Sequence, residues 1–508
     1  MVSLAPQGRR AVLLPLALSL ALAVSLVLPR ARAASGTSTV ADATWGTALA
    51  PTGRAQRVWA LAVAGNRVYL GGEFTAMVPP GAGAAATQTQ TRNHLAALDV
   101  DRHSLLPWNP DADGTVRALV LSADGTKLYV GGDFEHIGGT PVSKLARLDL
   151  TTGKVDPTFR PSVHGGVRGL ALAGDRLYVG GTFGSVAGPA GDEPRPKLAA
   201  LDAATGALLP WLPPALGPGR YVSHNGTPTP GDPSGDVLSL AVPSDASRVY
   251  VAGTFLDFAG RAGLLVLDAA TGQPLPTQWN TGRPIFDLAL SPADGRTVFA
   301  SAGGPGGRVY AFSPTQPKGP LWSTAVDGDA PGVAASDTTV YLMGHYDYAG
   351  PQNDLRHHLA AFDATDGAVD AWDPAANTPT GAFSAAVGAD HVFVGGEFTR
   401  INGVPQPGFA EFALSPAPPT TTTTSTSTST TTTTTSSTSK TTSTSTTTST
   451  STTTTTTKTT PTTKTTPTTT PKPTSTSTTA APSTPTTASS MTAKGAGPAP
   501  PADAASGP

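Results

Sequence analysis

The sequence contains no cysteine and only 13% charged residues. Without cysteine the chain forms no disulfide framework, no Cys-ligated zinc or iron–sulfur site and no Cys nucleophile. Long uninterrupted helical stretches are also lacking, because 56 glycines and 49 prolines among 508 residues break the chain too often for a helical bundle. These absences leave a turn-rich all-β protein. The sequence therefore indicates its architecture and location better than any chemical activity.

The first 33 residues have the pattern of an export signal. Arg9 and Arg10 precede an apolar run over residues 11–28, and Ala31-Arg32-Ala33 is a small-x-small cleavage site. We therefore expect residues 1–33 to be a signal peptide. Two alternatives stay open: the apolar run is long enough for an uncleaved membrane anchor, and the Arg pair resembles a twin-arginine signal, which exports folded proteins.

From Pro416 onward the sequence consists almost entirely of Thr, Ser and Pro. Such a segment has few apolar side chains to bury and cannot offset the entropy cost of ordering. We therefore expect residues 416–508 to form a disordered tail. The same composition is typical of O-glycosylated stalks, so we also expect the tail to carry sugars.

The charge of the body differs from that of the whole chain. Of the 33 basic residues, four lie in the signal and five in the tail, whereas only one of the 35 acidic residues lies outside the body. The body therefore has 24 basic and 34 acidic residues, a net charge of about −10. Nucleic-acid binding needs a basic surface stripe, so we expect no nucleic-acid partner.

Between the two ends, over residues 34–415, one pattern recurs. It comprises an apolar strand, a strand ending in Gly-Gly-acid-Phe, a variable loop, a strand ending in Leu-Asp, a Thr-Gly turn and a strand with Trp. The Gly pair or its equivalent falls at Gly71, Gly131, Gly180, Ala252, Gly303, Met343 and Gly395, so six intervals cover 324 residues at a mean period of 54. Four-stranded repeats of nearly this length are typical of propeller blades, and seven copies predict seven blades.

The phase of the repeat predicts how the ring closes. The seventh copy runs into the tail without a Trp-bearing strand, whereas Trp45 lies in such a strand before the first copy begins near Val58. We therefore expect Ala43 to Leu49 to be the outer strand of the last blade, which would otherwise keep an unpaired edge. The predicted fold is an all-β, seven-bladed β-propeller closed by an N-terminal strand, with a disordered Thr/Ser/Pro-rich C-terminal tail.

Residues that recur at a fixed phase are interpreted as structural. Tryptophans in the outer-strand position are expected to pack between blades, and aspartates that precede a Gly at a fixed offset are expected to cap turns. The expected structural residues are Trp45, Trp108, Trp211, Trp279, Trp322, Trp372, Asp149, Asp202 and Asp268.

The repeat resembles the delta-60 type of β-propeller repeat, found in secreted bacterial proteins and similar to the propeller of fungal cortical marker proteins. The matching residues include Val68 to Phe74, Leu95 to Asp99 and their counterparts through Phe412. The resemblance implies the propeller fold and no particular activity.

Ligand binding is expected on the face where the loops between second and third strands and the loops between blades emerge, because the longest loops all belong to that set. Two of these loops are rich in Tyr, Arg, Asp and His, which can hold sugars or peptides. The expected ligand-binding residues are Arg220, Tyr221, His224, Asp232, His345, Tyr346, Asp347, Tyr348, Arg356 and His357. No residue is assigned to catalysis, metal binding or a cofactor, because nothing places a nucleophile, a base and an oxyanion donor in one geometry.

The sequence therefore predicts a secreted or cell-wall-associated monomer, without a stable membrane span once the signal is removed. It would act as a binding or scaffold module for an extracellular glycan, wall polymer or protein. A propeller enzyme is the alternative. It would be quinoprotein-like, because Leu201 to Gly206 followed by Trp211 is similar to a tryptophan-docking repeat, or a hydrolase or lyase acting on a sugar or lactone.

Overall fold

The computed structural model describes residues 36–414, except residues 83–87, 218–220, 223–227, 230–234, 258, 278, 305 and 379. All described residues belong to one compact unit. The expected signal peptide and almost all of the expected tail lie outside the described residues. In the part of the chain that is described, no helix is long and apolar enough to cross a membrane.

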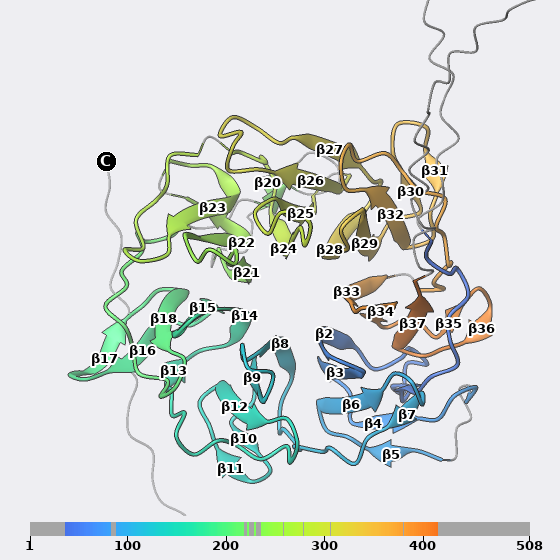
Figure 1. The fold of residues 1–508 in the computed structure, drawn as a ribbon, viewed down its shortest axis with the longest axis horizontal. Helices are drawn as coiled ribbons and strands as arrows, with labels where there is room; N and C mark the ends of the chain where they lie inside the picture. The colour runs from blue at the N-terminus through green and yellow to red at the C-terminus, as the bar shows by residue number, and fades with distance from the viewer. Residues whose placement is uncertain are drawn as a thin grey trace, which may run out of the picture. The chain divides into compact units, whose positions relative to one another are not determined.

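The described residues form nine antiparallel sheets of three or four strands and four two-stranded hairpins (Figure 1), which confirms the all-β prediction. Seven of the nine sheets repeat one order of a first, a second and a third strand. The first strands of the sheets are β2 (Val58–Ala64), β8 (Val116–Leu121), β14 (Val167–Ala173), β21 (Val237–Ala241), β24 (Ile285–Leu290), β28 (Asp329–Ala335) and β33 (Ala382–Val387). The second strands are β3 (Arg67–Gly72), β9 (Lys127–Gly132), β15 (Arg176–Gly181), β22 (Arg248–Leu256), β25 (Val298–Ala302), β29 (Thr339–His345) and β34 (His391–Gly396). The third strands are β6 (Leu95–Asp99), β12 (Leu145–Asp149), β18 (Leu198–Asp202), β23 (Ala262–Asp268), β26 (Arg308–Phe312), β32 (Leu359–Asp363) and β37 (Phe409–Ala413).

A fourth strand is present in two of these sheets, as β7 (Ser104–Leu105) and β27 (Trp322–Ala325). In four others the outer edge carries a single bridge, such as the one between Leu148 and Val155. The expectation of four full strands per repeat is therefore corrected. Proline has no N–H to donate to a ladder, and Pro157 follows the bridge within two residues, which limits the length of this edge.

The remaining, shorter strands form the four hairpins and the two other three-stranded sheets. These are β1 (Gly46–Thr47), β4 (Ala76–Val78), β5 (Gln90–Thr91), β10 (His136–Ile137), β11 (Thr140–Pro141), β13 (Val163–His164), β16 (Ser185–Gly188), β17 (Gly191–Pro194), β19 (Tyr221–Val222), β20 (Pro228–Thr229), β30 (Tyr348–Ala349), β31 (Asp354–Leu355), β35 (Arg400–Ile401) and β36 (Val404–Pro405). Most lie between a second and a third strand, so they build up the face on which those loops emerge.

The first strands bring neighbouring sheets together. Consecutive first strands contact each other from β2 to β33, and β2 also contacts β33. Figure 1 shows these strands facing a common centre. The second strands are buried almost throughout, whereas β2 and β8 alternate between buried and partly exposed residues at their starts. This alternation points every second side chain of a first strand toward the centre.

Aromatic side chains fill the spaces between sheets. Trp108, Trp211, Trp279 and Trp372 are at most 6% exposed, whereas Trp45 and Trp322 are only partly buried. The indole N–H groups donate to backbone oxygens as follows: Trp108 to Asp149 (3.4 Å), Trp211 to Asp268 (3.4 Å), Trp279 to Gln316 (3.0 Å), Trp322 to Ala364 (3.0 Å) and Trp372 to Ser38 (2.8 Å). The first four acceptors belong to the next sheet along the chain, so each of these tryptophans links two sheets.

The N-terminal segment lies differently from the expected strand over Ala43 to Leu49. Within that range, β1 pairs with β4 of the first repeat rather than with β37. Residues 37–42 lie along β37 instead: Thr37 forms a bridge with Leu414, and the Ser38 amide donates to the Ala413 oxygen (2.8 Å). The expected strand over Ala43 to Leu49 is therefore corrected: residues 37–42, which form one bridge and two backbone hydrogen bonds but no regular strand, lie at this edge instead.

The reason for this shift is the connection that leads into the first repeat. Asp42 N donates to Glu411 O (2.9 Å), as Leu106 N donates to Ala97 O (2.8 Å) at the outer edge of the first sheet. Five residues further, Thr47 already belongs to β1, whose pairing with β4 matches that of β13 with β16. The N-terminal segment thus contacts two neighbouring repeats: residues 37–42 contact the last one and β1 contacts the first. The position of Trp45 in the sequence did not show where one part ends and the other begins.

Strand register also corrects the fifth copy of the repeat. Ala60 pairs with Gly71 in the first copy, and the residue in the same place in β24, Asp287, pairs with Ser301. Ser301 therefore takes the position of the first Gly of the pair, whereas the sequence pattern placed it at Gly303. The Gly-Gly of the fifth copy lies beyond β25, so matching by residue type shifted the alignment by two residues.

Candidate functional site

Every first strand has a β-bulge near its start. The register shifts lie between Val58 and Ala60 in β2 and at equivalent places in the other six. The extra residue of a bulge has no pairing partner on the neighbouring strand. It interrupts the regular alternation of side chains between the two faces of the sheet. The bulged residues that line the cavity between the first strands are Trp59, Arg117, Arg168, Leu238, Phe286, Pro331 and Phe383. We call these seven residues the bulge ring.

The cavity inside the first strands has a volume of about 760 Å³. The bulge ring lies toward one end of it, because Val58 at the start of β2 pairs with Gly72 at the end of β3. The loops that follow the second strands leave from this same end. A cavity of this size, with apolar walls and a few polar groups, is typical of small-ligand sites.

Two arginines stand next to each other in the bulge ring. Arg117 Nε donates to Asp133 Oδ2 (3.3 Å) and Arg168 Nη1 donates to the same oxygen (2.6 Å). Asp133 is the acidic residue of the Gly-Gly-acid-Phe motif in the second repeat. We call Arg117, Arg168 and Asp133 the arginine wall.

The acidic position of the Gly-Gly-acid-Phe motif also supplies acids where the last sheet meets the first, namely Glu397 after β34 and Glu73 after β3. Glu397, whose side chain is 1% exposed, accepts from Arg57 Nε (2.7 Å) and Arg54 Nη1 (3.0 Å). Glu73 Oε2 lies 3.6 Å from Arg57 Nη1. Burial of the Glu397 carboxylate is favourable only with such partners, so Arg54 and Arg57 stabilise this acid as ion pairs. The sequence pattern identified the acids of the motif as strand ends and missed this role.

An aromatic cluster continues from the arginine wall. The Trp59 ring stacks on Phe383 with a centroid distance of 4.5 Å, and the Arg117 guanidinium lies 4.8 Å from the Trp59 ring centroid. Trp59 is the one tryptophan that does not follow the repeat phase. That departure, and the arginines at the second position of apolar strands, are the sequence signals from which this site was recognisable.

The wall formed by β24 and β28 is acidic. Asp287 accepts from Ser239 Oγ (2.8 Å), Leu288 N (2.9 Å) and Val333 N (3.2 Å), so it ties three first strands together. Burial raises the pKa of its carboxyl group to about 6. Asp329, which accepts from Gly304 N (2.8 Å), and His345 line the same cavity.

The raised pKa of Asp287 predicts a specific pH dependence. The folded state holds this proton up to about pH 6, whereas the unfolded chain releases it near pH 4, so ionisation of Asp287 lowers stability as pH rises between these values. Relative to wild type, Asp287→Asn should therefore gain about 2 kcal/mol of unfolding free energy as the pH rises from 4 to 7. The gain is smaller than the full pKa shift implies, because water in the cavity solvates part of the charge. Urea unfolding at both pH values measures this difference. A constant offset between the two proteins would contradict it.

Of the expected ligand-binding residues whose side chains the structure describes, only His345 lines the cavity. Tyr346 lies in the core, 2% exposed, and its hydroxyl donates to Leu342 O (2.6 Å), so burial holds its pKa well above the usual range. Tyr346 occupies the Phe position of the motif, which explains why it is not on the loop surface as expected. Asp347 and Tyr348 are exposed.

The other residues of this loop bind the protein itself. Arg356 Nε donates to Asp370 O (3.0 Å), and His357 Nδ1 lies 2.9 Å from Asp373 Oδ2. The second expected loop is not described in the same detail. Arg220, His224 and Asp232 lie outside the described residues, and of Tyr221 only the backbone pairing with Thr229 in β19–β20 is described. The expectation that the two loops form one binding face therefore stays a prediction.

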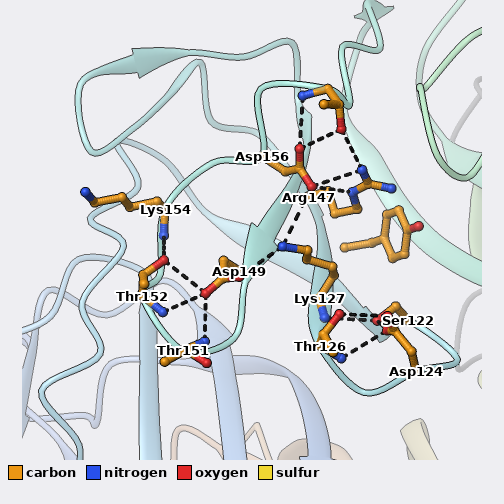
Figure 2. Close-up of polar contacts among 12 residues, drawn as sticks. Ser122, Asp124, Thr126, Lys127, Arg147, Asp149, Thr151, Thr152, Lys154 and Asp156 are labelled. Atoms are coloured by element: carbon orange, nitrogen blue, oxygen red, sulfur yellow. Dashed lines mark hydrogen bonds and ion pairs between the residues drawn. The ribbon is translucent and has the colours of Figure 1, made fainter.

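The aspartates expected to be structural sit in turns. Figure 2 shows Asp149, whose Oδ1 accepts from the amides of Thr151 (3.1 Å) and Thr152 (2.9 Å), while Lys127 Nζ donates to Oδ2 (2.9 Å). Lys127 and the turn N–H groups hold the Asp149 pKa at about 2. Asp202 and Asp268 make the same turn contacts, with Thr205 and Thr271 lowering their pKa values. Across the described ranges, no three His, Asp or Glu side chains form a metal-binding group.

Comparison with known proteins supports a β-propeller-type repeat. A family described as "Domain of unknown function (DUF5122) beta-propeller" matches residues 123–159, which contain most of the contacts in Figure 2. No curated protein matches the chain. The chain therefore contains a β-propeller-type repeat.

Proposed function

We propose that this protein is a secreted or cell-envelope β-propeller that binds an extracellular glycan, wall polymer or protein at the mouth of its central cavity. The observation that carries this proposal is the bulge ring. Seven strands each turn one residue into the same 760 Å³ cavity, and the resulting set mixes arginine with aromatic and aliphatic side chains. Such a set offers both shape and directional hydrogen bonds to a ligand.

The finer architecture belongs to the same proposal. Seven blades of the delta-60 type would close through residues 37–42, which lie along β37 while β33 contacts β2. Export is supported by the signal pattern of residues 1–33, and the Thr/Ser/Pro-rich tail would act as a flexible, glycosylated stalk. The body's net charge of about −10 argues against a nucleic-acid partner.

Array screening tests the binding proposal. The full chain should bind a subset of features on a glycan and peptide array, and Phe286→Ala should weaken that binding at least roughly tenfold through lost contact area in the cavity. Tyr348→Ala, an equally aromatic change on an exposed loop, is the matched control and should leave binding unchanged. An array without specific binding would refute the proposal. Loss of binding in Tyr348→Ala alone would move the ligand site to the loop.

A hydrolase or lyase acting on a sugar or lactone is the second candidate, and Asp287 is the observation that favours it. A carboxyl group with a pKa of about 6 that lines a cavity can donate or accept a proton near neutral pH. Turnover of an array-identified ligand that is abolished in Asp287→Asn would establish this alternative. Unchanged ligand after prolonged incubation would support binding alone.

A further inference from the structure

The arginine wall contains two guanidinium groups and one carboxylate. Arg117 and Arg168 approach the same oxygen of Asp133, and their side chains are 28% and 24% exposed. The described residues provide no hydrogen-bond partner for the Nη groups of Arg117. Each arginine therefore retains N–H donors beyond those that Asp133 satisfies.

The wider charge balance leaves one positive charge at this wall. Including the adjacent group, the cations are Arg54, Arg57, Arg117 and Arg168, and the anions are Glu73, Asp133 and Glu397. Burial, and then the neighbouring Arg168, lower the pKa of Arg117. Both effects mean that the guanidinium charge is incompletely neutralised, so an added anion near it would be stabilised.

The opposite wall has the reverse character. Asp329, Asp287 and His345 supply oxygen and nitrogen atoms that accept hydrogen bonds, and Phe286 lies on the same wall, in β24. Trp59 and Phe383, which stack on each other, lie between this wall and the arginine wall in the order of the bulge ring. The cavity mouth thus has cationic donors on one side, acceptors on the other and aromatic surface beside both.

We infer that the cavity mouth binds an acidic sugar, with its carboxylate at Arg117 and Arg168 and its hydroxyl groups toward the wall formed by β24 and β28. This inference rests on the proposed binding function and adds the chemical class of the ligand. A pyranose ring has apolar C–H faces that pack on Phe286, hydroxyl donors that match the acidic wall, and one charge.

The charge also distinguishes a carboxylate from a phosphate. One uncompensated positive charge is neutralised by a singly charged group, whereas a phosphate dianion would leave net negative charge beside Glu73 and Asp133. The planar guanidinium fork also matches the two oxygens of a carboxylate. We therefore expect a monoanionic sugar to be preferred over inorganic phosphate.

Titration of the full chain with glucuronate and glucose tests the inference, because these sugars differ only by a carboxylate in place of a hydroxymethyl group. At low ionic strength, glucuronate should bind at least roughly tenfold tighter than glucose, as expected for a charged hydrogen-bonded pair. Arg117→Gln and Arg168→Gln should each remove most of this preference. Arg102→Gln removes the same charge from a side chain that is 74% exposed in the turn after β6 and should keep it.

Folding of the variants is checked by melting. Each single change leaves Asp133 with one arginine, so the melting temperatures should stay close to that of Arg102→Gln. Arg117→Lys is the second variant: it keeps the charge but loses the fork, and should have an intermediate preference.

Three results would overturn the inference: glucuronate binding no tighter than glucose, a preference that survives both Gln changes, or displacement of glucuronate by a lower concentration of inorganic phosphate. Array binding that persists in Arg117→Gln and Arg168→Gln would leave the proposed binding function standing and remove only the acidic-sugar assignment.

Discussion

A chain that begins at Gly46 should be less stable to unfolding than a chain that begins at Ala34 by on the order of 5 kcal/mol. The missing segment makes two backbone hydrogen bonds to β37, through Ser38 and Asp42. It also accepts a hydrogen bond from the Trp372 indole, and Thr44 Oγ1 donates to Glu411 Oε1 (3.0 Å), whose other carboxylate oxygen lies 3.0 Å from His103 Nδ1. Each bond contributes roughly 1 kcal/mol, and the loss of one of the two partners of a buried carboxylate adds to this.

Urea unfolding of both chains measures this difference, with the Ala34 chain as the control that lacks only the expected signal. Adding a peptide of residues 34–45 to the shorter chain should restore part of the lost stability, because the peptide can pair with the free edge of β37. Equal unfolding midpoints for the two chains would contradict closure through residues 37–42.

Trp372→Ala should lower the unfolding free energy by about 3–5 kcal/mol. Trp372 is 2% exposed and packs edge-on against Tyr341 and Phe412, with centroid distances of 5.5 and 5.4 Å. Truncation of a buried aromatic side chain loses its transfer free energy and leaves a cavity between two sheets. The indole also donates to Ser38, so the same change weakens the N-terminal segment.

Trp45→Ala is the matched comparison, because the two residues were assigned the same outer-strand position from the sequence. Trp45 is only partly buried, so its replacement should cost about half as much. Urea unfolding of both variants gives the ratio. A larger loss for Trp45→Ala than for Trp372→Ala would show that Trp45, not residues 37–42, holds the last sheet.

Much of the architecture was predictable because the repeat is local. Strand-length apolar segments, turn glycines and the Asp-x-x-x-Gly spacing each reflect contacts within a few residues, as the turn contacts of Asp149 and Gly153 illustrate. The two errors of position, in the fifth copy and in the N-terminal strand, occurred where residue type and strand register diverge. Ser301 stands at the position of the first Gly of the pair, because it pairs with Asp287 as Gly71 pairs with Ala60. The pairing partner, and not the residue type, identifies this position.

The candidate site was not predictable in the same way. The loops rich in Tyr, Arg and His attracted attention because of their composition, yet Arg356 and His357 bind the protein's own Asp370 and Asp373. Apart from Trp59, Arg117 and Arg168, the residues of the bulge ring carry no signal in the sequence, since a Phe or a Leu in an apolar strand is expected to be core. A bulge changes the direction of one side chain without any change in residue type.

By itself, then, the sequence determined the all-β class, the β-propeller-type repeat and the turns that connect its strands, because these depend on the polarity and backbone preferences of neighbouring residues. Only the tertiary structure decided that Arg117 and Arg168, from two different sheets, share Asp133, and that Asp42 rather than Trp45 lies along β37. Such contacts join residues 16 to 369 positions apart, and the packing of one sheet against the next sets their distances.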